Sequence, residues 1–373
     1  MEQVGTPEEI LADATGKQER LRAFLEQQGL DAVVIGRQDN FAWITAGGDS
    51  RVITTAETGF AYLVITQDRK WLVSHSMDGR RFMDEQVSGQ GYDLVTLFWH
   101  QGTPEQKVSE LTRGMKVGAD VALPGARLLG SELVDLHYPL TDLDLLRCRW
   151  IGQAANEILG HVARDLQPGV SEQEVAARLL YEYGREGLTI DVLIVGFDER
   201  ITRYRHPMPT ENRLQRYALL HPAARRWGLH ANVTRLVHFG EPPSNIRRAM
   251  DGVATIGGRV AGMLAPGLRF TDILTEQIGL YRKLGYSGEW MYHFQGGITG
   301  YVLADATRCT DQEARLVERQ AYDYFITITG AKFEELTILT EDGPEMPSLG
   351  PGWPARAVQT PNGEISVPDV LIL

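Results

Sequence analysis

The chain has 373 residues, of which 43% are hydrophobic and 23% are charged, and its 37 basic and 49 acidic residues give a net charge of −12. This length exceeds the ~100–200 residues of a typical domain, so two domains with separate cores are expected. The acidic balance disfavours nucleic acid and anionic membranes as partners, because no excess of basic groups is available to neutralise phosphates.

The cysteines and the first residues bear on the cell compartment. Cys148 and Cys309 are the only cysteines and lack CxxC spacing, which argues against a disulfide framework and a thiolate zinc site. Residues 1–31 carry acids from position 2 onward and no long apolar run, and no stretch approaches the ~18 apolar residues of a membrane span. We therefore expect a cytoplasmic protein with neither a signal peptide nor an anchor.

The first part of the chain alternates helical and strand patterns. Residues 17–29 have apolar side chains at helical spacing and end at Gly29, and the run LDAVVIG that follows is typical of a buried strand. The runs GFAYLVIT and KWLVSH flank QDR and predict a hairpin. This alternation predicts a small α/β domain over residues 1–148, and a long helical pattern then opens a second domain over 149–373.

The second domain contains an internal repeat with an offset of 98 residues. Pro168-Gly169 and Pro266-Gly267 each separate two helical patterns, and a glycine stands 18 residues after each Pro-Gly. Ser171 and Glu174 have the spacing of a capping box. Two such units, each followed by strands, predict two halves related by a pseudo-twofold axis, with a cleft where they meet.

Histidines interrupt the strand pattern LHPAARRWGLHANVTRLVHFG, residues 220–240. His230 and Asn232 are two residues apart and therefore share one face of a strand. His221 lies in the preceding strand, close enough for a cross-strand contact, whereas His238 falls further along and is interpreted as structural.

The order of the segments resembles a known family. The first helix–Pro-Gly–helix unit, RYRHPMPT, the histidine-containing hairpin, the second unit, YHFQGGITGY and ITGAKFEELTILTEDG follow one another as in the pita-bread fold family of Xaa-Pro aminopeptidases, prolidases, methionine aminopeptidases and creatinase. GLDAVVIGRQDNFAWITAGG resembles the N-terminal domain of the creatinase and prolidase branch. The resemblance implies an α+β pita-bread domain with pseudo-twofold halves, preceded by a smaller α/β domain.

The same resemblance implies two metal ions held by two Asp, one His and two Glu. The family pattern matches His221 to Arg235 without a gap, which places His221 and Asn232 at the two Asp positions. The glycine-rich motif places Gly297 at the His position, and the first Glu falls near Phe325 or Ile326. Only Glu334 matches a ligand, so we expect neither a two-metal site nor any cofactor. A single metal held by His221, His230 and Glu334 is an open alternative.

The altered positions predict general acid–base chemistry. His206 resembles a proton-handling His of the family, including that of metal-free creatinase, and His293 resembles the His before the glycine-rich motif. We predict His206, His293, Glu334 and His221 as catalytic. Arg203 and Arg205 can bind a carboxylate. The other predicted substrate-binding residues are polar or aromatic: Tyr204, His230, Asn232, Tyr292, Gln295 and Tyr301.

We therefore predict a metal-independent enzyme acting on a small amino-acid-derived substrate. The reaction is either hydrolysis of a C–N bond or an amine–carbonyl condensation or cyclisation in a biosynthetic pathway. Two alternatives are open: a metal-dependent Xaa-Pro peptidase, and a catalytically inactive peptide-binding module. The resemblance also implies a homodimer in which Asn40, Phe41 and Trp43 border the partner's cleft.

Overall fold

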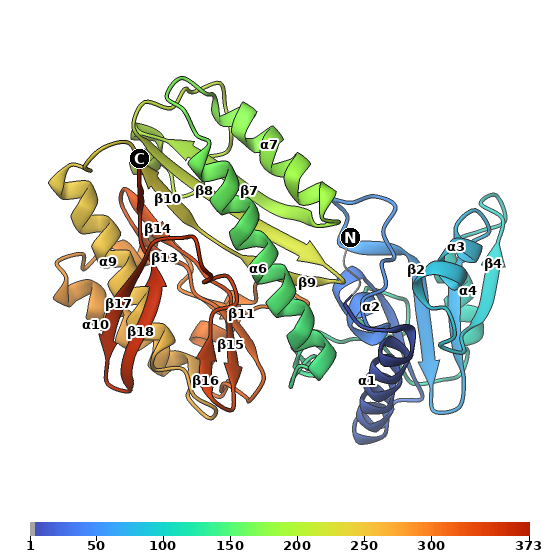
Figure 1. The fold of residues 1–373 in the computed structure, drawn as a ribbon. Coiled ribbons are helices and arrows are strands. Elements are labelled where there is room, and N and C mark those ends of the chain that lie inside the picture. The colour runs from blue at the N-terminus through green and yellow to red at the C-terminus, as the bar shows by residue number, and fades with distance from the viewer. Residues whose placement is uncertain (1–3) are drawn as a thin grey trace. The chain divides into compact units, whose positions relative to one another are not determined.

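Residues 4–373 are described by the computed structural model, and their contacts divide them into two units, one ending at Leu143 and the other beginning at Asp144 (Figure 1). The predicted boundary between residues 148 and 149 lies inside helix α6, Asp142–Arg164. None of the helices in the described part of the chain is both long and apolar enough to cross a membrane.

The N-terminal unit is built on one six-stranded sheet with the order β4-β3-β2-β1-β5-β6. The predicted hairpin is confirmed, because β2 and β3 pair in antiparallel fashion on either side of a short turn. The strands are β1 Ala32–Arg37, β2 Thr58–Thr66, β3 Lys70–His75, β4 Asp93–Leu97, β5 Val117–Ala119 and β6 Arg127–Leu128. The helices are α1 Pro7–Gln28, α2 Gln38–Ile44, α3 Gly79–Arg81, the π-helix η1 Phe82–Gln86, α4 Pro104–Leu111 and α5 Ser131–Asp135.

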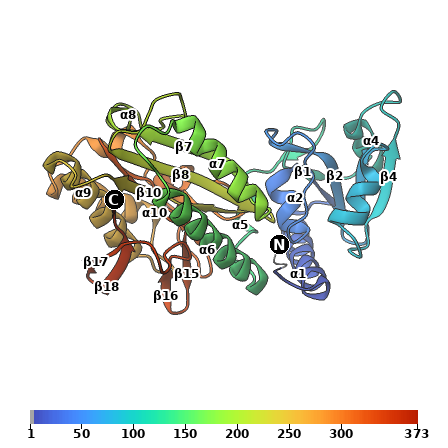
Figure 2. The same ribbon diagram turned by 45° about the horizontal axis from the view of Figure 1, so that its top comes forward.

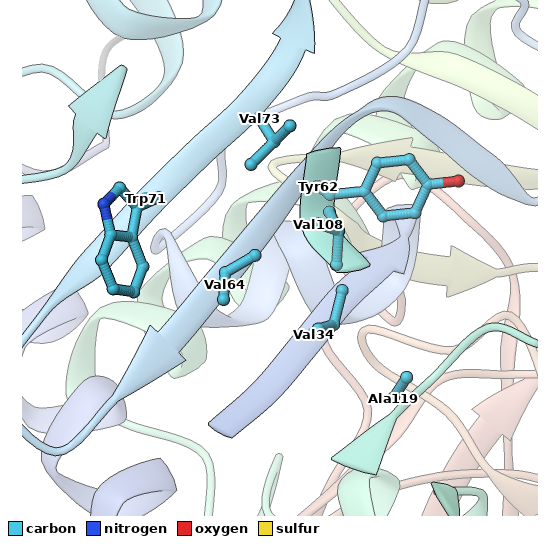
Figure 3. Close-up of a cluster of buried hydrophobic side chains, with 7 residues drawn as sticks. All are labelled: Val34, Tyr62, Val64, Trp71, Val73, Val108 and Ala119. Atoms are coloured by element: carbon cyan, nitrogen blue, oxygen red, sulfur yellow. The ribbon is translucent and has the colours of Figure 1, made fainter. Parts of the chain in front are cut away.

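Alternate residues of neighbouring strands form the core of this unit. Tyr62 and Val64 of β2 pair with Val73 and Trp71 of β3, so all four project from one face of the sheet (Figure 3). Val108 of α4 covers them. The residues between them, such as Leu63 and Leu72, are also buried, so both faces of the sheet are covered and the strands are continuous apolar runs.

Asn40, Phe41 and Trp43 do not form an exposed rim. They lie on α2 and are 3%, 0% and 0% exposed. The Asn40 amide donates to Asp120 Oδ2 at 2.9 Å, and its oxygen lies 2.9 Å from Nε2 of His137. The expectation that these side chains border a partner's cleft is therefore wrong, because they form part of their own unit's interior.

The C-terminal unit consists of two halves with matching helix–turn–helix segments. Gly169 N donates to Leu214 O at 2.7 Å, and Gly267 N donates to Leu316 O at 2.8 Å. Both glycines have positive φ, 96° and 86°, which a residue with a side chain rarely adopts. The predicted pseudo-twofold arrangement is confirmed by these paired contacts. The helices of the two halves are α6 with α7 Glu172–Arg185, and α9 Ser244–Ala261 with α10 Phe270–Lys283.

The strands of this unit form one five-stranded and one four-stranded sheet and two hairpins. Helices α6 and α7 run alongside the sheet that contains β7 and β8 (Figures 1 and 2), whereas α9 packs on β13, β14, β17 and β18. The first sheet contains β7 Thr189–Phe197, β8 Tyr217–Arg226, β9 Leu229–Asn232, β10 Arg235–His238 and β19 Leu371–Ile372. The second contains β11 Gly297–Ile298, β12 Ala321–Asp323, β15 Thr337–Thr340 and β16 Gly343–Glu345. The remaining elements are β13 Ile326–Ile328, β14 Ala331–Phe333, β17 Ala355–Thr360, β18 Gly363–Pro368, the short helix α8 Glu199–Arg203 and the 3-10 helices η2 Glu289–Tyr292 and η3 Ala306–Thr310.

Candidate functional site

The β8–β9 hairpin sets the position of the first site residues. Its two-residue turn, Trp227-Gly228, has φ values of 54° and 80°, as a tight hairpin turn requires. The resulting register places Asn232 opposite Ala223, on the face that also carries His221. His221 Nδ1 lies 3.0 Å from Thr234 Oγ1, which confirms that residues on both sides of the turn meet.

Five buried polar side chains then come together, and we call them the carboxylate cluster. Its members are His221, Asn232, Asp323, Lys332 and Glu334, each at most 3% exposed. Nε2 of His221 lies 3.6 Å from Oε1 of Glu334, and the Lys332 ammonium lies 2.5 Å from Oε2 of the same carboxylate. The Asn232 amide donates to Asp323. The members come from β8, β9, β12 and the β14 hairpin, so the fold rather than local sequence assembles them.

The two carboxyl groups of the cluster have opposite pKa shifts. Burial and the nearby Glu334 charge raise the pKa of Asp323 well above its usual value. Burial alone would also raise the pKa of Glu334, but the neighbouring charges of His221 and Lys332 lower it. Glu334 is therefore the carboxyl group that ionises more readily and pairs with Lys332, whereas the environment of Asp323 favours its protonated form. Burial lowers the pKa of His221 to about 4, so its imidazole is neutral.

His206 and His293 form a second group. Their Nε2 atoms are 2.9 Å apart, and Nδ1 of His293 donates to the carbonyl of Phe294 at 2.9 Å. Nε2 of His293 is therefore the acceptor, and His206 donates to it. Burial and the Lys332 charge lower the pKa of both rings, that of His293 to about 4. The ring of Phe325 packs on His293 and lies 5.9 Å from the Lys332 ammonium, so it separates the two groups.

The predicted substrate-binding histidine and arginines have partners within the chain. His230 contacts Gly300 O at 2.8 Å and Asp191 Oδ2 at 3.1 Å. Arg203 is exposed and pairs with Glu199 on the same helix at 3.0 Å. Arg205 pairs with Glu289 and lies over the ring of Tyr292. Of the two arginines, Arg205 is the one whose contacts connect it to another predicted site residue.

The predicted aromatic and amide residues divide into exposed and buried ones. Tyr204 and Tyr292 are 50% and 68% exposed and are free to contact a substrate. Tyr301 is only 1% exposed, and its hydroxyl donates to Asp144 Oδ1 at 2.6 Å, so it acts as a core residue rather than as a cleft wall. Gln295 is buried and donates to the carbonyls of Trp290 and His293, which ties down the segment that carries His293.

Sequence reasoning missed Asp323 and Lys332. The family resemblance placed the first Glu of the metal-binding pattern near Phe325 or Ile326. In the structure, the acidic residue that joins the cluster is Asp323, at the end of β12. The register of β11 and β12 sets Gly297 directly opposite Asp323. The spacing of Lys332 and Glu334, two residues apart in a strand pattern, was a signal that both face the same side.

The residues present do not match a two-ion centre. Across residues 4–373, no three His, Cys, Asp or Glu side chains are arranged closely enough to hold a metal ion as they stand. Gly297 supplies no ligand, and a Cβ there would lie 2.3 Å from the carbonyl oxygen of Asp305. Asn232 Oδ1 and Asp323 Oδ1 are buried and accept no hydrogen bond. They lie beside Glu334, whose carboxylate is paired with the Lys332 ammonium, so the cluster as it stands does not fit a divalent ion.

Comparison with known families identifies the architecture. The model of metallopeptidase family M24 matches residues 147–323, and that of the creatinase/prolidase N-terminal domain matches residues 17–128. The chain is a member of the pita-bread M24 family. An uncharacterized peptidase of Staphylococcus saprophyticus is 21% identical over 189 residues, which are 48% of this chain and 54% of that relative. The alignment therefore spans about half the length of that protein.

Solved structures of the M24 family share the fold over nearly the whole chain. The Xaa-Pro dipeptidase from Bacillus anthracis is 20% identical with a TM-score of 0.74, and the match covers 96% of this chain and 100% of that one. The dipeptidase PepE from Mycobacterium ulcerans is 17% identical with a TM-score of 0.77, and the match covers 97% of this chain and 98% of that one. The X-Pro aminopeptidase from Thermotoga maritima is 16% identical with a TM-score of 0.74, and the match covers 95% of this chain and 99% of that one.

These findings overturn the main functional prediction. A metal-independent acid–base enzyme for a small amino-acid-derived substrate is wrong, because the matching family is one of metallopeptidases and the similar structures are named as Xaa-Pro peptidases and prolidases. The alternative of a metal-dependent Xaa-Pro peptidase is better supported.

Proposed function

We propose that this M24 protein hydrolyses short peptides of the Xaa-Pro type with the help of a divalent metal ion. The observation that supports this function best is the match to the model of metallopeptidase family M24 over residues 147–323, together with the fold shared with solved Xaa-Pro peptidases over nearly the whole chain.

The metal ion is inferred from the family, because the described side chains of the carboxylate cluster do not hold one as they stand. When bound, such an ion polarises a carbonyl group and lowers the pKa of a coordinated water. Thr234 can accept the Nδ1 proton of His221, which leaves the Nε2 lone pair directed at the cluster. A bound cation would also favour the ionised form of Asp323, whose pKa is otherwise raised.

The histidine pair supplies proton transfer in this proposal. Because His206 donates its Nε2 proton to His293, its Nδ1 keeps a lone pair and can take up or release a proton near the cluster. His206 is exposed and so is accessible to a peptide. Arg205 is placed beside Tyr292 to receive a substrate carboxylate, once Glu289 releases it.

The test is hydrolysis of Xaa-Pro dipeptides by protein that has been stripped with a chelator and then supplied with Mn²⁺, Co²⁺ or Zn²⁺. We expect activity only after metal addition. Asp323→Asn should lower kcat/KM by roughly 10- to 100-fold, because it removes one of the two carboxyl groups of the carboxylate cluster. The exposed Asp272→Asn serves as a matched control. Undiminished turnover after chelation, or in Asp323→Asn, would refute the proposal, and no turnover of any peptide with any ion would point to the inactive peptide-binding module.

Two further parts of the proposal concern assembly and location. We expect a homodimer. Light scattering at micromolar concentration measures the molar mass directly, and the mass of a monomer would contradict this expectation. A cytoplasmic location stays a prediction from composition and is tested by fractionating cells that produce the protein at its native level.

A further inference from the structure

His206 lies on a loop, residues 198–212, that we call the His206 loop. The loop lies between β7 and β8, and the short helix α8 is the one regular element within it. Its position therefore depends on contacts with the rest of the unit. Nε2 of His206 lies 2.9 Å from Nε2 of His293, and a shift of about 1 Å breaks a hydrogen bond of this length.

Glu172, the first residue of α7, binds the beginning and the end of this loop. It is 0% exposed. Its Oε1 accepts hydrogen bonds from the backbone N–H of Phe197 at 2.9 Å and from Nδ2 of Asn212 at 3.3 Å. Its Oε2 accepts from the backbone N–H and the hydroxyl of Thr210, at 2.9 and 2.7 Å. Nε of Arg200, on α8, lies 3.0 Å from Oε1.

The carboxylate of Glu172 serves this loop rather than its own helix. The start of α7 is capped by Ser171 and Glu174, whereas the donors to Glu172 named above all lie within residues 197–212. A buried carboxylate is costly unless it is paired, and its removal leaves buried donors without their acceptor. The loop therefore stabilises the charge, and the charge fixes the loop.

Two further contacts connect this carboxylate to the position of His206. Nη2 of Arg200 donates to the carbonyl of Met208 at 2.8 Å, two residues after His206. Pro207 is buried and packs so closely on β7 that a Cβ on Gly196 would lie 2.3 Å from its Cγ. The backbone that follows His206 is thus held against the sheet.

We propose that Glu172 is a positioning residue that holds the His206 loop so that His206 meets His293. The same loop carries Arg205, which pairs with Glu289. Glu172 acts through the loop, because it is buried beneath it. This arrangement goes beyond the proposed function, and only its effect on hydrolysis rests on that function.

Limited proteolysis tests the hold on the loop. Glu172→Gln keeps the shape of the side chain but replaces one oxygen by an amide nitrogen, which cannot accept a hydrogen bond. Trypsin should then cleave after Arg203 and Arg205 about tenfold faster than in the native chain, because the loop opens more often. Glu182→Gln is the matched control, since Glu182 lies on the same helix and pairs with Arg185 at its surface. Equal cleavage in Glu172→Gln and the native chain would overturn the proposal.

NMR titration of the imidazoles separates positioning from a general loss of stability. Burial is the main cause that lowers the pKa of His206. In folded Glu172→Gln the ring should be more exposed, so its pKa should rise toward the ordinary value of about 6.5. Glu182→Gln should leave it as in the native chain. An unchanged pKa of His206 in Glu172→Gln would contradict the positioning role.

Kinetics with an Xaa-Pro dipeptide give the third readout. Since the loop carries both His206 and Arg205, Glu172→Gln should lower kcat and raise KM, and kcat/KM should fall by roughly 100-fold. A lower kcat with an unchanged KM would indicate only a smaller folded fraction and would count against the proposal. If the native chain hydrolyses no peptide, the proposed function falls, whereas proteolysis and NMR still decide the role of Glu172.

Arg200→Met serves as a second variant if Glu172→Gln does not fold. It removes the ion pair and the hydrogen bond to Met208 from the loop side and leaves the buried carboxylate with its other donors. The proposal requires faster cleavage after Arg203 and a raised pKa of His206 in this variant too. An Arg200→Met chain that matches the native chain in both would refute it.

Discussion

His293 shows how burial changes the chemistry of one residue. The pKa of its imidazole is lowered to about 4, first by burial and then by the Lys332 charge. In the unfolded chain the ring has its ordinary pKa of about 6.5. Between pH 4 and pH 6.5 the folded protein therefore binds fewer protons than the unfolded chain. The stability that this difference contributes is present above pH 6.5 and is lost as the pH falls toward 4.

We therefore expect the free energy of unfolding to fall between pH 7 and pH 5. In His293→Phe the fall should be smaller by on the order of 1 kcal/mol, allowing for the partial exposure of the ring, because the variant keeps an aromatic ring but cannot titrate. Urea unfolding at the two pH values measures this difference. His161→Phe, at an exposed position, should leave the fall unchanged, and an equal effect of both variants would contradict the assignment.

The site residues that strand periodicity alone could bring together are those within one hairpin. Alternation along β8 and β9 places His221 and Asn232 on one face, and local spacing suffices for this. Asp323 and Lys332 could not be placed in the same way, because their meeting with Asn232 and Glu334 depends on the pairing of β11 with β12 and on how the β14 hairpin packs. Such contacts between distant segments leave no periodic trace in a single sequence.

Among the elements, the paired Pro-Gly turns are the feature that sequence predicts best. Their glycines need positive φ, and this local requirement appears directly as a residue type. The sequence pattern predicted helix α1 only from residue 17 onward, because nothing in the residues before that position shows apolar periodicity. The helix begins at Pro7 with a capping box between Thr6 and Glu9, but its first turns are polar and exposed and so show no apolar periodicity.

The predicted capping box of α7 is confirmed and can be tested. Ser171 Oγ accepts from Glu174 N at 3.2 Å, and Ser171 N donates to Glu174 Oε2 at 2.7 Å. Ser171→Ala should lower the free energy of unfolding by about 1 kcal/mol, because it leaves a helix N–H without a partner. Thermal and urea unfolding measure the change. Ser88→Ala, at an exposed serine in the turn that follows η1, should have no effect; a loss of equal size there would contradict this explanation.

At the scale of the whole molecule, α6 decides where the chain can be divided. The predicted cut at residue 149 would remove about the first two turns of α6, including Asp144, which accepts the hydrogen bond from the buried Tyr301 hydroxyl. We expect a fragment of residues 141–373 to fold and to melt at a higher temperature than a fragment of residues 149–373. Circular dichroism melts of both fragments test this, and equal melting temperatures would show that the first two turns of α6 contribute nothing.

The space around Gly297 limits which residue that position accepts. Because a Cβ there would collide with the backbone of Asp305, a side chain cannot be introduced by exchanging that residue alone. The segment that contains Asp305 would have to move first, and that segment is held by the bridge between Ile298 and Asp305. Any larger residue at position 297 therefore requires a second, compensating change in the segment that follows.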